Sequence, residues 1–144
     1  MIGNWVATTD EGTQIQAVYQ WQLRRHMVST HFKTGSFENR GMVFYSPSEQ
    51  NVVQVGVDNV GGSSRGIWHP DGDKAVVRLE YTQRSGETTK MEIIHSKVDA
   101  DTMKVVMYGV DQSGRLADEP WATLEYKRQQ QKPKDKAETT VIVP

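Results

Sequence analysis

Hydrophobic and polar residues alternate along most of this 144-residue chain. The clearest case is residues 14–22, where Ile15, Ala17, Tyr19 and Trp21 alternate with glutamines. Successive side chains of a β-strand point to opposite faces, so this pattern predicts a strand with one buried and one solvated face. No stretch of the chain has the period of an amphipathic helix.

Turn sequences divide the chain into segments of strand length. Pro70-Asp71-Gly72-Asp73 is the clearest, because proline presets one turn dihedral and glycine accepts a positive one. Such signals recur at roughly 8–12-residue spacing, which is typical of antiparallel barrels and sandwiches. The expected strands cover residues 5–7, 14–22, 26–33, 37–45, 53–57, 65–69, 77–81, 88–98, 103–107 and 122–126.

These segments predict an all-β fold. Successive hairpins favour an up-and-down meander, and closing the sheet removes the exposed edges that so many strands would otherwise present. We therefore expect a single antiparallel β-barrel of about 8–10 strands. The barrel is expected over residues 1–128, followed by a polar, lysine-rich tail over residues 129–144.

Three local features extend this prediction. Val53, Val55 and Val57 are expected to form the inward face of their strand. Gly41 is expected to mark a bulge or a bend at a barrel corner. The apolar end of the tail, residues 141–143, is either a strand that docks on this barrel or on a second copy, or a vector-derived sequence.

Composition narrows the classes of function. The absence of cysteine excludes disulfides, thiolate metal sites and cysteine nucleophiles. A formal net charge of −1 gives no broad attraction for nucleic acid or for an anionic membrane, so no nucleic-acid partner is expected. No apolar run approaches the roughly 20 residues that cross a bilayer, so no membrane span is expected.

The start of the chain bears on its location. Met1 stands a few residues before the first expected strand, and no signal-peptide pattern opens the chain. We expect the sequence to be cut from a longer protein with a further domain upstream. The expected location is the cytoplasm for the sequence as it stands, and outside the cell if it is an excised domain.

Two short motifs carry a resemblance to a known superfamily. Gly3-Asn4-Trp5 and the basic pair Lys127 and Arg128 resemble the calycins, which include the lipocalins. The resemblance implies that Trp5 opens the first strand and that a basic side chain of the last strand covers its indole. A closer resemblance is to bacterial lipocalin-like domains of unknown function, which often follow a SnoaL-like domain. It is carried by Met1-Ile2-Gly3-Asn4-Trp5, Gly61-Gly62 with Gly66-Ile67-Trp68, Asp71-Gly72-Asp73, Asp99-Ala100-Asp101-Thr102 and Gly114-Arg115-Leu116.

The chain departs from two other barrel families. Fatty-acid-binding proteins hold a carboxylate with an Arg-x-Tyr on a late strand, whereas the last strand here reads Glu125-Tyr126-Lys127-Arg128. Haem-binding nitrobindin-like barrels need a proximal histidine and a glycine-rich opening that this chain does not reproduce. The resemblance therefore implies no haem or fatty-acid role, and no cofactor is expected.

Five residues are the candidates for a pocket inside the barrel. Tyr19 and Trp21 share one strand face, and His95 follows Met91 at the strand period. Met107 is expected to face the same interior. Aromatic rings with polar tips and adaptable methionines suit an apolar ligand pocket, and they equally suit a filled core.

Charged residues outside this set receive weaker assignments. Arg65 and His69 alternate with Ile67 and are expected at the barrel rim, where a cation beside a histidine suits a carboxylate or phosphate. The pairs Asp71/Asp73 and Asp99/Asp101 lack further carboxylates and read as turns rather than calcium loops. No metal site is expected.

Three functions remain open from the sequence. The preferred one is a non-enzymatic domain that binds a small apolar or amphipathic molecule inside the barrel. The second is an isomerase, cyclase or hydrolase in which His95 is the base and Tyr19 or Arg65 polarises the substrate. The third is a structural module that forms a homodimer through barrel walls or through residues 141–143.

Overall fold

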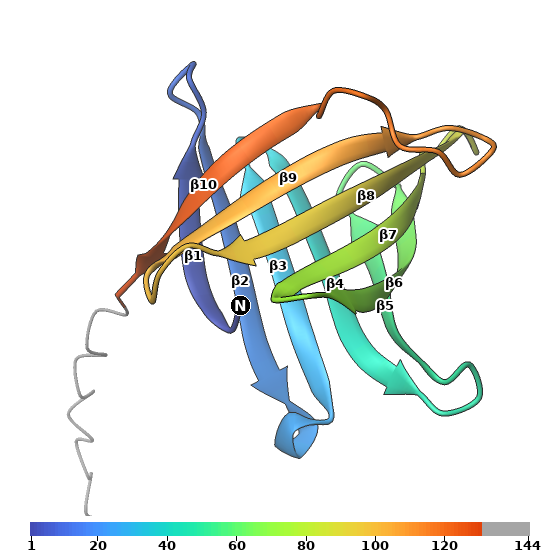
Figure 1. Ribbon diagram of the computed structural model, residues 1–144, viewed down its shortest axis with the longest axis horizontal. Helices are drawn as coiled ribbons and strands as arrows, with labels where there is room; N and C mark the ends of the chain where they lie inside the picture. The colour runs from blue at the N-terminus through green and yellow to red at the C-terminus, as the bar shows by residue number, and fades with distance from the viewer. Residues whose placement is uncertain (131–144) are drawn as a thin grey trace, which may run out of the picture.

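The protein is a closed barrel of ten antiparallel strands, seen here in a computed structural model that describes residues 1–130. Each strand pairs with the next along the chain, and β1 closes the barrel against β10 (Figure 1). The all-β barrel prediction is confirmed; the expectation for residues 141–143 lies outside the described residues. The strands are β1 (Gly3–Thr8), β2 (Gln14–Gln22), β3 (Met27–Thr34), β4 (Phe37–Ser46), β5 (Asn51–Asp58), β6 (Ser63–Asp71), β7 (Lys74–Thr82), β8 (Thr88–Lys97), β9 (Thr102–Val110) and β10 (Ala122–Gln129).

The up-and-down order gives the barrel two distinct ends. One end, called here the N-terminal end, holds the chain start and the β2–β3, β4–β5, β6–β7 and β8–β9 turns. The opposite end holds the remaining turns and the long loop between β9 and β10. Most turns follow the predicted chemistry; at the β6–β7 turn, for example, Gly72 has a φ of 60°. The β2–β3 turn differs, because Leu23, Arg24 and Arg25 all have positive φ without a glycine.

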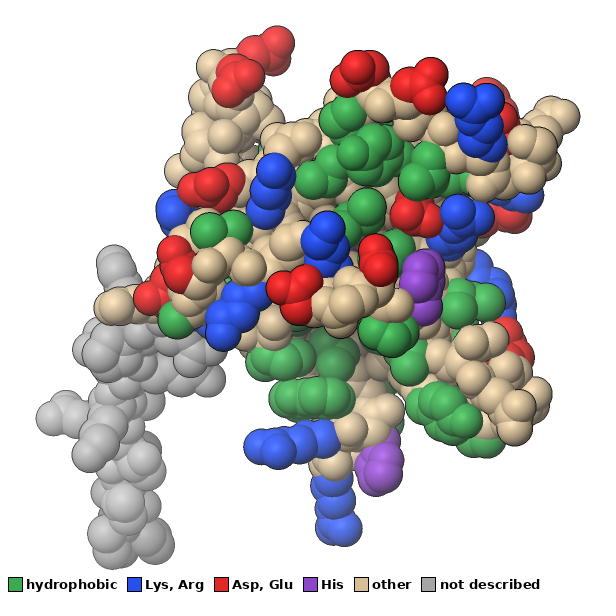
Figure 2. Space-filling model, viewed as in Figure 1, with side chains coloured by type: hydrophobic (Ala, Val, Ile, Leu, Met, Phe, Trp, Pro, Cys, Tyr) green, Lys and Arg blue, Asp and Glu red, His purple; other side chains and the backbone are tan. Residues whose placement is uncertain are grey.

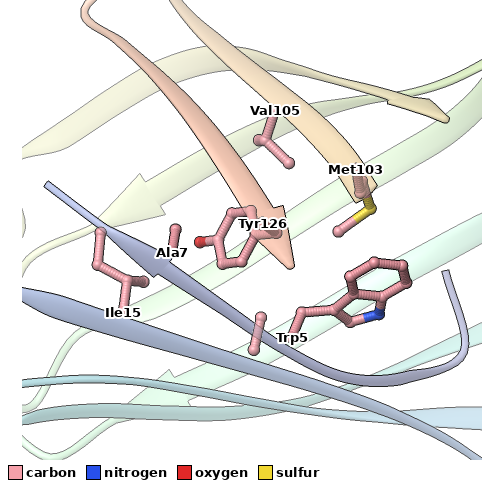
Figure 3. Packing of buried hydrophobic residues seen from close by; sticks show 7 residues of the cluster. Trp5, Ala7, Ile15, Met103, Val105 and Tyr126 are labelled. Atoms are coloured by element: carbon pink, nitrogen blue, oxygen red, sulfur yellow. The ribbon is translucent and has the colours of Figure 1, made fainter. Parts of the chain in front are cut away.

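The hydrophobic core fills the part of the barrel formed by β1, β2, β9 and β10 (Figure 3). Its largest ring is Trp5, which is 3% exposed and points inward beside Met103. The indole Nε1 donates a hydrogen bond to the carbonyl of Met1 at 2.7 Å. The guanidinium carbon of Arg128 lies 4.3 Å from the Trp5 ring centroid, the contact that the calycin resemblance implies. Trp5 and Arg128 therefore tie the first strand to the last.

The inward face of β5 differs from the prediction. Gln54 points into the barrel, so Val53, Val55 and Val57 face outward by strand alternation. Val57 is 63% exposed, whereas Val53 is buried on the outer wall between its register partners on β4 and β6. Valines occur on both faces of this strand, so their number gave no guide to which face is inside.

Gly41 does not form a bulge. It lies in continuous registers with Thr30 of β3 and Gly56 of β5. A Cβ at Gly41 would collide with the backbone carbonyl oxygen of Val55 and stand 2.9 Å from the Thr30 hydroxyl. The residue is therefore a point of close strand approach.

We expect Gly41→Ala to lower the free energy of unfolding by about 1–3 kcal/mol, because the added methyl meets backbone that cannot rotate away. Urea unfolding followed by circular dichroism measures the change. Gly56→Ala is the control: its Cβ would stand 3.0 Å from the Ser64 hydroxyl, which can turn aside, and 3.3 Å from the Arg40 carbonyl oxygen, a milder backbone contact than that at Gly41. Equal losses in the two variants would contradict the steric argument.

Candidate functional site

The barrel interior contains a partly open cavity of about 330 Å³ beside the core. Strand alternation determines most of its lining, because side chains two residues apart on a strand point to the same side. Most of these side chains are apolar or aromatic. The lining comprises Ala17, Tyr19, Thr30, His31, Phe32, Phe37, Asn39, Gln54, Ser64, Trp68, Val77, Leu79, Tyr81, Met91, Ile93, His95, Val105, Met107, Leu124 and Tyr126.

His95 contributes to this lining a fully buried side-chain nitrogen without a hydrogen-bond partner in the described residues. Its side chain is 7% exposed, and its Nδ1 atom is buried without a partner among the described residues. The imidazole packs on Trp68, with ring centroids 5.0 Å apart. Trp68 is itself satisfied, since its Nε1 donates to Gln54 Oε1 at 2.8 Å. The tryptophan therefore holds the histidine ring without using its nitrogen.

Burial keeps three titratable groups of the cavity, His95, Tyr19 and Tyr126, uncharged at neutral pH. It lowers the pKa of His95 from 6.5 to about 4, while backbone groups of Ala75 and Ile93 act in the opposite direction. Burial also raises the pKa of Tyr19 to about 12 and raises that of Tyr126. At neutral pH the site therefore offers a neutral imidazole and two neutral phenols.

The structure brings together four of the five predicted pocket residues. Tyr19, Met91, His95 and Met107 all line the cavity. Trp21 does not: it lies at the end of β2 and is 49% exposed. Because β1 pairs with β2 only as far as Tyr19, the last residues of β2 extend beyond the barrel.

Arg65 and His69 lie on the outer wall rather than at the cavity. Arg65 forms an ion pair with Glu49 Oε2 at 2.5 Å, so its cation already has a partner. His69 lines the same shallow outer depression as Arg65. Their alternation with Ile67 was predicted correctly, and it is the reason that Trp68 points inward.

The aspartate pairs behave as turn residues. The Asp99 carboxylate accepts a hydrogen bond from the backbone N–H of Asp101 at 2.8 Å, which is an Asx turn. Within residues 1–130, no three histidine, aspartate or glutamate side chains are grouped so that they hold a metal ion. In the same part of the chain, no helix has the length and apolarity to cross a membrane.

Sequence reasoning missed several lining residues. Trp68 was available from alternation, since it faces away from Ile67. Gln54 was missed because the valines around it suggested the opposite face. Tyr126 was noted as part of the last strand but was not assigned to the pocket. Comparison with known proteins adds no further assignment, because no protein-family model and no curated protein matches the chain.

Proposed function

We propose that the barrel binds a small, largely apolar molecule with one hydrogen-bonding group, without catalysing a reaction. The cavity volume of about 330 Å³ is within the range of about 300–1,000 Å³ typical of small-molecule pockets. The lining combines aromatic and methionine side chains with a few polar atoms, as such pockets do. We also propose a lipocalin-like kinship, supported by Gly3, Trp5 and the Arg128 contact.

The observation that carries this proposal is the unpartnered Nδ1 of His95. A buried polar atom without a hydrogen bond costs about 1–3 kcal/mol, so such atoms are rare. A ligand that supplies the missing hydrogen bond recovers this cost, while its apolar part fills the space between Met91 and Met107. The polar group of the ligand is therefore expected beside His95.

The same histidine argues against the enzymatic alternative. A general base works best when its pKa lies near the working pH, and burial lowers the pKa of His95 to about 4. Within the described residues no side chain hydrogen-bonds to its Nδ1 atom, so the histidine lacks the acidic partner that orients the base in a catalytic triad. A neutral hydrogen-bonding role suits the residue better.

We expect Met107→Trp to weaken ligand binding at least about tenfold, because the larger ring occupies the cavity. The probe is N-phenyl-1-naphthylamine, an apolar molecule with one N–H group, titrated by its fluorescence. Native mass spectrometry of freshly purified protein tests in parallel for a retained ligand. The control is Met42→Trp, the same change at an exposed position.

Both variants must show the circular dichroism spectrum of the unchanged protein for the comparison to count. Loss of binding in Met107→Trp alone supports the proposal. If the unchanged protein binds neither the probe nor a retained ligand, the carrier function is wrong. Equal binding by both variants would place the probe outside the cavity.

A further inference from the structure

The β2–β3 hairpin projects from the N-terminal end of the barrel (Figure 1). Its tip exposes two large apolar side chains, with Leu23 71% and Trp21 49% accessible. The turn that joins β2 to β3 has positive φ at Leu23, Arg24 and Arg25, and it contains no glycine. Backbone strain of this kind is retained mainly where it serves a function.

The tip is also basic. Arg24, Arg25 and His26 are exposed, and within residues 1–130 neither arginine belongs to an ion pair. No aspartate or glutamate occurs from residue 12 to residue 37, which includes all of β2 and β3. Figure 2 shows blue and purple side chains at this tip and red side chains along the opposite end. The tip of the β2–β3 hairpin is therefore locally basic.

A second projection lies beside the first. The β4–β5 hairpin exposes Tyr45 and Val52, which are register partners. Val52 also pairs with the cavity-lining Trp68, and Trp21 follows the cavity-lining Tyr19 on the same face of β2. Figure 1 shows both hairpins extending farther than the β6–β7 turn, which carries Asp71 and Asp73, and farther than the β8–β9 turn, which carries Asp99 and Asp101. The apolar and basic groups of the β2–β3 tip therefore meet an approaching surface before those four aspartates do, and Glu49 in the β4–β5 hairpin is paired with Arg65.

We propose that this tip docks the protein on a bilayer that contains anionic phospholipids. Trp21 and Leu23 enter the headgroup region, and Arg24 and Arg25 bind lipid phosphates. Aromatic and leucine side chains next to arginines are the composition of interfacial membrane segments. Arginines without an ion pair beside exposed apolar side chains, on strands that carry no carboxylate, complement a surface that is anionic outside and apolar beneath, which favours a membrane over a protein partner.

This docking surface is separate from the cavity, and it stands whether or not the cavity holds a ligand. Docked in this way, the protein turns the N-terminal end of the barrel toward the lipid. The charge argument further requires that binding fall at high salt, because screening shortens the reach of the arginines.

Co-sedimentation with vesicles tests the proposal. The protein is expected to bind vesicles of phosphatidylcholine mixed with phosphatidylserine and to bind phosphatidylcholine alone weakly. Arg24→Gln with Arg25→Gln should lower the partition coefficient about 30-fold, and Leu23→Ser should also lower it. Arg24→Lys with Arg25→Lys keeps the charge and should bind within a few-fold of the unchanged protein. The control is Arg84→Gln with Arg115→Gln, which removes equal charge at the opposite end.

The outcomes are distinct. No binding to either vesicle, or equal binding to both, overturns the proposal. Equal weakening by the control pair shows a general charge effect and also overturns it. If the protein binds soluble polyglutamate but not vesicles, the membrane proposal is wrong and the tip binds an acidic polypeptide instead. Titration of the same variants with N-phenyl-1-naphthylamine, without vesicles, keeps this result separate from the cavity proposal.

Discussion

Replacing Trp5 with alanine is expected to lower the free energy of unfolding by about 3–5 kcal/mol. Trp5 is 3% exposed and is the largest side chain of the core cluster, so its removal leaves a cavity that β1 and β10 cannot easily close. The change also removes the ring under Arg128 and the hydrogen bond to the carbonyl of Met1. Urea unfolding with two-state analysis measures the loss.

The matched control is Trp21→Ala, which removes the same side chain at an exposed position. Its effect on unfolding is expected to be within about 0.5 kcal/mol. Similar losses in the two variants would contradict the placement of Trp5 in the core. A large loss in Trp21→Ala alone would show that the projecting hairpin, rather than the β1–β10 seam, stabilises the barrel.

Most of the architecture could be predicted from the sequence, because turns and strand alternation depend only on residues that are close together in the chain. The β6–β7 hairpin shows this well: Gly72 takes the positive φ that its turn predicts, and Asp71 pairs with Lys74. The inward direction of His95 was also local information, since it follows Met91 and Ile93 at the strand period. These features need no knowledge of the rest of the chain.

The errors arose where the answer depends on distant parts of the barrel. Alternation puts Trp21 on the same face as Tyr19, yet it cannot show that β1 begins opposite Tyr19 and that Trp21 therefore has no partner on β1. The valines of β5 do not reveal which face of the strand is inside. Val53 is buried although it lies on the outer wall, so an apolar residue on this strand need not face the interior. The positive φ angles of Arg24 and its neighbours could not be predicted, because the turn contains no glycine or asparagine that would indicate them.

Charge state is a further property that the sequence does not contain. Burial in the barrel, rather than any neighbouring residue type, lowers the pKa of His95 to about 4. That shift makes stability depend on pH. In the unfolded chain the imidazole binds a proton near pH 6.5, whereas in the folded protein it stays neutral until about pH 4. The stabilisation is complete above pH 6.5 and is lost as the pH falls toward 4.

We therefore expect the free energy of unfolding to fall by roughly 2–3 kcal/mol more in the unchanged protein than in His95→Gln when the pH is lowered from 7.5 to 4.5. Urea unfolding at both pH values, with both proteins, gives the difference. Carboxylates such as Asp111, whose pKa is lowered by the Ser113 hydroxyl, are present in both proteins and cancel. The N-terminal ammonium, whose own pKa burial lowers, is present in both proteins, so its titration also cancels in the difference.

The difference between the two pH dependences is what decides the result, because His95→Gln also alters the contact with Trp68 at every pH. Parallel pH dependences would mean that His95 titrates normally and is reached by water, and the argument for a neutral, unpartnered imidazole in the cavity would then fail. A ligand bound to the neutral ring adds to the effect: affinity for N-phenyl-1-naphthylamine should hold from pH 7.5 to about 5 and fall below pH 4, where the protonated ring no longer tolerates an apolar neighbour.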